Sequence, residues 1–152
     1  MKIACFHLMP YRDLDDDFEK KYPSSWFSLP FSEVADRQKV SQYFNWTLDE
    51  LTFAAESGFD GVCTNEHHQN AYGFMVNPNL MGSVLARATR GKDTAIIQMG
   101  ETAVFLNPPI RVAEEYAMLD AISEGRLVAG FPVGLGGDFS YSYGMAPMEQ
   151  RA

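Results

Sequence analysis

The sequence predicts an α/β protein of the (β/α)8 TIM-barrel type, with about the first four βα units present in its 152 residues. Short apolar runs alternate with amphipathic helical segments, and this alternation is typical of a parallel sheet with right-handed crossovers. From Gly100 to Gly134 a strand end, a proline-containing loop, a helix and a second apolar run follow one another. No glycine-rich phosphate fingerprint follows the first strand. This favours half of a barrel over a doubly wound sheet.

The first expected strand, residues 3–9, is apolar throughout, which favours a central position in the sheet. An aromatic-rich insertion with an acidic run follows at residues 11–46, and we expect it to lack regular structure. Its aromatic content argues against disorder. The insertion is therefore either a lid over a binding site or an ordered segment packed on its own side chains.

The first long helix is expected to begin at Thr47, because Thr47 and Glu50 have the spacing of a capping box. Apolar residues continue from there at helical spacing, and Gly58 marks the expected end. A second strand at residues 61–65 leads directly into residues 66–68, whose sequence is Glu-His-His.

Two further helices and two further strands complete the expected pattern. Asn77 caps a helix that has Pro78 in its first position. Strands are expected at residues 94–99 and 127–131, and the helix between them ends at Gly125. The last apolar run lacks alternation, which is typical of a strand covered on both faces. In a sheet of four such units, the first and fourth strands are open edges.

After the fourth strand the sequence predicts a glycine-rich and aromatic loop, and residues 148–152 look like the start of another helix. The net charge of −8 argues against nucleic acid or an anionic membrane as the main partner. Cys5 and Cys63 lie within apolar runs, so we expect buried, reduced thiols. No segment has the length of a membrane span or signal peptide, so a cytoplasmic location is expected.

The histidines at the end of the second strand are the strongest candidates for chemistry, because barrel active sites lie at the carboxyl ends of the strands. His67 is the candidate acid/base, since an imidazole titrates near neutral pH. Adjacent strand residues point to opposite faces, so His68 is expected to be structural. Glu66 either orients an imidazole or belongs to a buried ion pair. A metal site on these residues, with His7 as a possible neighbour, is disfavoured because consecutive ligands fit a strand poorly.

Three of these motifs resemble the bacterial luciferase-like flavin-dependent monooxygenase family: NEHH at residues 65–68, NPPIRVAEEYAMLDAISEGRLVAGFPVG at residues 107–134, and the run from Asp138 to Gly144. The resemblance covers most of residues 1–144. It implies that residues 1–152 form one domain, the amino-terminal half of a (β/α)8 barrel. It also implies a monooxygenase that uses reduced FMN and dioxygen to oxidise a small organic substrate.

The resemblance also implies site residues. His67 matches the histidine that acts as acid/base near the flavin. Five residues match positions that lie against the flavin in this family: Gly100, Glu101, Thr102, Phe131 and Pro132. Pro132 stands where some luciferases have a reactive cysteine, so light emission is not expected. The basic groups that hold the flavin phosphate in the family lie on later strands, beyond Ala152.

The resemblance further implies a homodimer or heterodimer that packs through helices of this half, with residues 77–90 and Met118 as candidate contacts. Two other readings stay open on the same scaffold. One is a deazaflavin-dependent oxidoreductase, which transfers hydride without oxygen. The other is a non-catalytic, flavoprotein-like assembly partner.

Overall fold

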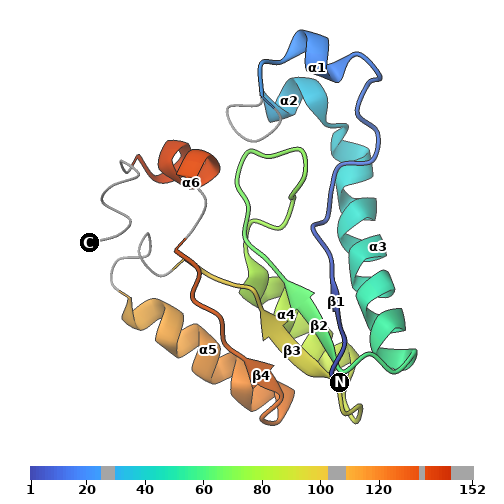
Figure 1. Cartoon of the computed structure of the whole chain (residues 1–152), viewed down its shortest axis with the longest axis vertical. Helices are drawn as coiled ribbons and strands as arrows, with labels where there is room; N and C mark the ends of the chain where they lie inside the picture. The colour runs from blue at the N-terminus through green and yellow to red at the C-terminus, as the bar shows by residue number, and fades with distance from the viewer. Residues whose placement is uncertain (25–29, 103–108, 134–135, 145–152) are drawn as a thin grey trace.

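The computed structural model describes residues 1–24, 30–102, 109–133 and 136–144, and these form a parallel four-stranded sheet flanked by helices (Figure 1). The strands follow one another across the sheet in chain order, and every neighbouring pair is parallel. The predicted α/β fold and the predicted edges, β1 and β4, are confirmed. The strands are β1 (Ala4–Phe6), β2 (Gly61–Thr64), β3 (Ala95–Gln98) and β4 (Leu127–Val128).

Three long helices cover one face of the sheet: α3 (Arg37–Glu56), α4 (Pro78–Ala88) and α5 (Ile110–Ser123) (Figure 1). Every second strand residue points to this face, and its partners come from all three helices. The helices thus bury one apolar layer against the sheet. The core comprises Leu51, Ala54, Ala55, Val62, Leu85, Ala86, Ile96 and Leu119.

The other face of the sheet is open. Strand register places Phe6, Cys63, Ile97 and Val128 side by side on it. Phe6 and Val128, at the two edges, are each 50% exposed, and a hollow of about 480 Å³ lies over the amino-terminal part of this face. The expected central position of the first strand is therefore wrong, because β1 is an edge. The expectation that the fourth strand is covered on both faces is also wrong, because the described helices pack on one side only.

Two compositional expectations concern the cysteines and the membrane. Both cysteines are free thiols. Cys63, in an inner strand, is 4% exposed as expected, whereas Cys5 on the edge strand is only partly buried. Within the described ranges, no helix combines the length and apolar character that crossing a bilayer requires.

The insertion at residues 11–46 contains regular structure, contrary to the sequence prediction. It holds two short helices, α1 (Phe18–Lys21) and α2 (Phe31–Val34), and the first half of α3. The capping box expected at Thr47 is wrong, because this residue is 2% exposed in the middle of α3. The helix begins ten residues earlier, where the Asp36 carboxylate accepts a hydrogen bond from the Gln38 amide at 2.8 Å.

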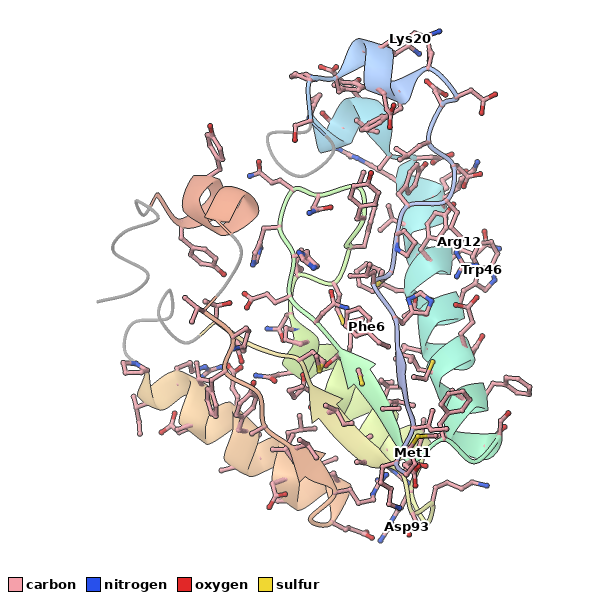
Figure 2. The ribbon with its side chains drawn as sticks, in the orientation of Figure 1. Met1, Phe6, Arg12, Lys20, Trp46 and Asp93 are labelled. Atoms are coloured by element: carbon pink, nitrogen blue, oxygen red, sulfur yellow. The ribbon has the colours of Figure 1, made fainter. Side chains whose placement is uncertain are left out.

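Aromatic packing fixes the insertion to the rest of the molecule. The Tyr11 ring stacks on Phe74 with centroids 5.4 Å apart and lies 5.2 Å from Tyr43. Arg12 and Trp46 lie beside each other on the outer side of α3, where the guanidinium is 5.8 Å from the indole centroid (Figure 2). The segment is therefore packed on aromatic side chains over the residues described, and its proposed role as a lid stays a prediction.

The ends of α4 and α5 follow the sequence signals. The Asn77 side chain accepts from the Leu80 amide at 2.9 Å, and Pro78 is the first helical residue, as predicted. The chain leaves α5 through two left-handed residues, Glu124 and Gly125. The aromatic loop expected after the fourth strand is wrong, because residues 136–143 form α6 (Gly136–Tyr143). The helix expected at residues 148–152 lies outside the described residues.

Candidate active site

The carboxyl ends of β2, β3 and β4 are joined by two hydrogen-bonded links. Glu66, just after β2, accepts at Oε2 from the Thr102 amide just after β3, at 2.8 Å. The Tyr116 hydroxyl accepts from the Glu101 amide at 3.2 Å and donates to the Gly130 carbonyl at 2.8 Å. The three strand ends therefore form one connected platform, at the edge where parallel α/β folds place their active sites.

His67 lies at this platform, under the loop of residues 69–76. Its amide donates to the Met75 carbonyl at 3.0 Å, and its side chain is partly buried. A Cβ added at Gly73 would lie 2.6 Å from both Cβ and Cδ2 of His67 and 2.7 Å from Cγ. Gly73 therefore leaves the space that the imidazole occupies.

His68 contacts Glu66 of the platform, which the sequence analysis did not foresee. Its Nε2 lies 2.9 Å from Glu66 Oε1, and its ring is edge-on to Tyr143 of α6, with centroids 5.2 Å apart. The alternation argument failed because β2 ends at Thr64, two residues before the Glu-His-His sequence. Burial and the nearby Glu66 raise the pKa of Tyr143 to about 12, so its hydroxyl stays protonated at neutral pH.

Gly100 and Gly130 allow the ends of β3 and β4 to approach closely. A Cβ added at Gly100 would collide with the Gly130 carbonyl oxygen, and one added at Gly130 would collide with the Gln98 carbonyl oxygen. Sequence reasoning explained Gly100 by contact with a flat ring. The neighbouring strand alone is a sufficient reason for glycine at this position.

The remaining candidate flavin contacts, Thr102, Phe131 and Pro132, differ in how far their side chains are exposed to solvent. Thr102 is 1% exposed, and its Oγ1 has no hydrogen-bond partner among the described residues. Phe131 is 62% exposed, with its ring 5.2 Å from that of Tyr116, and Pro132 is partly exposed. The exposed Phe131 ring fits a flat heteroaromatic ligand, which would cover it, and the orphaned Thr102 hydroxyl is a donor that such a ligand would have to reach below the surface.

The Glu101 side chain points away from this open surface. It is 4% exposed, and its Oε2 accepts from Asn79 Nδ2 at the start of α4. Burial raises the pKa of the Glu101 carboxyl to about 7, with a further contribution from Glu115 and Glu66. Asn79 and Glu115 gave no signal in the sequence, because both lie on helical surfaces where polar residues are usual.

The described residues include no group of three His, Cys, Asp or Glu side chains arranged to hold a metal ion. His7, considered as a neighbour of such a site, is held elsewhere. Its Nε2 lies 2.6 Å from Glu50 Oε2, and its Nδ1 accepts from the Met9 amide at 2.8 Å. These two contacts fix the end of β1 against α3.

A parallel βα sheet with polar and histidine side chains gathered at the carboxyl ends of its strands has the architecture of (β/α)8-barrel enzymes. A family model then gives the assignment within this class. The model described as luciferase-like monooxygenase matches residues 23–152. The chain belongs to this family.

Several relatives carry named activities. The oxygenase component of a flavin-dependent trigonelline monooxygenase of Acinetobacter baylyi is 31% identical over 72% of this chain and 29% of its own length. The alkanal monooxygenase alpha chain of Photorhabdus luminescens is 31% identical over 62% of this chain and 25% of its own. The alkanal monooxygenase beta chain of Vibrio harveyi is 28% identical over 69% of this chain and 32% of its own length. The chain thus spans about a quarter to a third of these relatives' lengths.

Solved structures show the same fold. A monooxygenase from Streptomyces bottropensis superposes with a TM-score of 0.71 at 26% identity, covering 99% of this chain and 39% of that one. The second structure is the oxygenating constituent of 3,6-diketocamphane monooxygenase of Pseudomonas putida, a type II Baeyer-Villiger enzyme solved with FMN. It superposes with a TM-score of 0.69 at 20% identity, covering 96% of this chain and 33% of that one. This chain is therefore a partial fragment of the luciferase-like barrel.

Proposed function

We propose that this chain supplies part of the active site of an FMN-dependent monooxygenase that oxidises a small organic substrate with dioxygen. The observation that carries the proposal is the connected platform, where Glu66, Thr102 and Tyr116 join three strand ends beside His67. The flavin-dependent relatives support the choice of cofactor. The relatives' substrates differ from one another, so the class proposed is a small organic molecule.

Reduced FMN, when bound, supplies the electrons that activate dioxygen. In our proposal the open faces of Phe131 and Pro132 cover the flavin ring, and Thr102 Oγ1 gives it a hydrogen bond. Gly100 and Glu101 contact the flavin through their backbone atoms, because the Glu101 side chain is hydrogen-bonded to Asn79 on the other side. His67 takes or gives a proton at its imidazole, and the loop of residues 69–76 keeps water from one side of that ring.

The test is oxygen uptake with reduced FMN by a full-length version that includes the later strands of the barrel, with the wild-type residue and with His67→Ala. We expect turnover to fall about 10²-fold, as on loss of a general acid/base, with flavin affinity changed little. Val76→Ala, an exposed position in the same loop, is the control and should keep its activity. An unchanged turnover in His67→Ala contradicts the proposed role. Hydride transfer from reduced deazaflavin without oxygen uptake contradicts the monooxygenase, and failure to bind either cofactor favours the non-catalytic partner.

We further propose that α4 and α5 pack against a second subunit, a copy of this chain or a related one. Apolar side chains stand on the outer side of both helices, among them Leu80, 69% exposed, and Met118, 65% exposed. They flank a groove of about 240 Å³ between the helices. Alpha and beta chains among the relatives' names agree with such a pairing. Sedimentation of the wild type and Met118→Glu tests it, since the charge should shift a dimer toward monomer. A wild type that sediments at 17.0 kDa contradicts a homodimer.

A further inference from the structure

Two carboxylates converge on one amide nitrogen between β3 and the helices behind it. Asn79 Nδ2, near the start of α4, donates to Glu101 Oε2 and also to Glu115 Oε2 of α5, the latter at 2.9 Å. Asn79 Oδ1 is buried without a hydrogen-bond partner among the described residues. The cluster therefore holds more acceptors than donors, and what it lacks is a proton.

The surrounding charges decide which carboxyl carries that proton. Arg111 Nε donates to Glu115 Oε1 at 2.7 Å, so Glu115 has a cation as its partner. Glu101 forms no ion pair with any of the described residues, and a third carboxylate, Glu66, faces it from the end of β2. Burial and these two negative neighbours penalise an ionised Glu101. The raised pKa of about 7 agrees with this assignment.

The backbone around Glu101 belongs to the platform of the site. Its amide donates to the Tyr116 hydroxyl, and the next amide, that of Thr102, donates to Glu66 Oε2 at 2.8 Å. The other oxygen of Glu66 contacts His68 at 2.9 Å. Any displacement of the Glu101 side chain from its pocket therefore moves the donor that Glu66 accepts from.

We infer that Glu101 is a positioning residue: in its uncharged form it fixes the end of β3 between α4 and α5, and so holds the Thr102 amide on Glu66. Ionisation weakens this docking because the new charge is buried and faces Glu115 and Glu66, while the nearby cation, Arg111, is paired with Glu115. The docked strand end is then favoured at acidic pH and loosened as the pH rises. This inference does not depend on flavin binding and goes beyond the proposed function.

The sign and size of the effect follow from linkage. The pKa of Glu101 is about 7 when docked and near the ordinary value of 4.5 when the strand end opens to water. Docking should therefore weaken by about tenfold for each pH unit between about pH 5 and 7, and level off above that. Glu66, His68 and Tyr143 of α6 also face this region, as do Arg111, Glu115 and Tyr116 of α5. The pH dependence that these groups contribute is the part that remains in a variant with an uncharged residue at position 101.

The test measures amide-exchange protection of Thr102 from pH 5 to 8 in the wild type, Glu101→Gln and Glu114→Gln. Glutamine imitates the uncharged acid, so Glu101→Gln should keep the protection and lose the pH slope. Glu114, exposed on α5, is the matched control and should keep the wild-type slope. In infrared spectra of the wild type, a protonated carboxylic acid band should be present at pH 6 and lost at pH 8.

Three results overturn the inference. One is wild-type protection at Thr102 that does not change with pH beyond intrinsic exchange. Another is a Glu101→Gln variant that keeps the wild-type slope. The third is a carboxylic acid band that persists in that variant. The wild-type measurements decide the question even if a variant does not fold, and no outcome depends on whether the protein binds FMN.

Discussion

Gly73→Ala should displace the imidazole of His67. The added methyl carbon would lie 2.6 Å from Cβ and Cδ2 of His67, whereas carbon atoms in contact are usually about 3.5–4.0 Å apart. The ring, the loop or both must therefore move by about 1 Å. His67 is tied to the loop by the hydrogen bond from its amide to the Met75 carbonyl, so backbone and ring will share the movement.

The expected cost has two parts. Overpacking of this kind usually lowers the free energy of unfolding by about 1–3 kcal/mol. A displacement of about 1 Å at an acid/base group lowers turnover by about 10²-fold when the group acts in the reaction. Gly91→Ala separates the two effects. Gly91 has a φ of 80° with open space around it, so alanine there is strained without touching His67.

The measurement is the NMR signal and titration of the His67 imidazole, together with turnover in oxygen uptake. Gly73→Ala should shift the ring signals and lower turnover. Gly91→Ala should lower the free energy of unfolding and leave the ring signals and turnover unchanged. Ring signals at wild-type positions in Gly73→Ala would refute the packing argument. Shifted signals with unchanged turnover would refute the acid/base role of His67 and leave the packing argument intact.

Three further predictions concern the helix start, the thiols and the insertion. Asp36→Ala should lower the free energy of unfolding by about 1 kcal/mol in thermal or denaturant melts through loss of the cap of α3, and an effect within error would contradict the cap. A thiol reagent should modify Cys5 before Cys63, because burial and the nearby Cys5 raise the pKa of the Cys63 thiol; the reverse order would contradict the burial pattern. The Tyr11 amide donates a hydrogen bond to the Ala71 carbonyl at 2.9 Å, so it should exchange slowly with and without flavin, and exchange that only flavin slows would support a lid.

The sequence predicted those elements whose signals are local. Asn77 and Pro78 are a cap and a first-turn proline within two residues, and the structure has both in place. The start of α3 was missed because the Thr47–Glu50 spacing imitates a cap in the middle of a longer helix. Asp36 before a polar first turn was the true signal, and the aromatic residues after it were assigned to a binding loop instead of a helix face.

The site was predictable only in part, for a related reason. The Glu-His-His sequence identified the end of β2, but the roles within it depend on where the strand ends, and β2 ends two residues before Glu66. The partners of Glu101 were out of reach for sequence reasoning, because Asn79 and Glu115 lie 22 and 14 residues away along the chain, on separate helices. Only packing of α4 against α5 brings their side chains to one point.

The platform and the buried carboxyl cluster are two sides of the same strand end. On the open side, Phe131 offers an exposed ring, and the buried Thr102 hydroxyl has no hydrogen-bond partner among the described residues. On the covered side, Glu101 is held by groups from α4 and α5, whose outer surfaces carry the exposed Leu80 and Met118. A subunit that packs on those helices would restrict the movement of Asn79 and Glu115. Occupancy of the proposed interface should therefore raise the protection of the Thr102 amide, because the same two helices form the wall against which Glu101 docks.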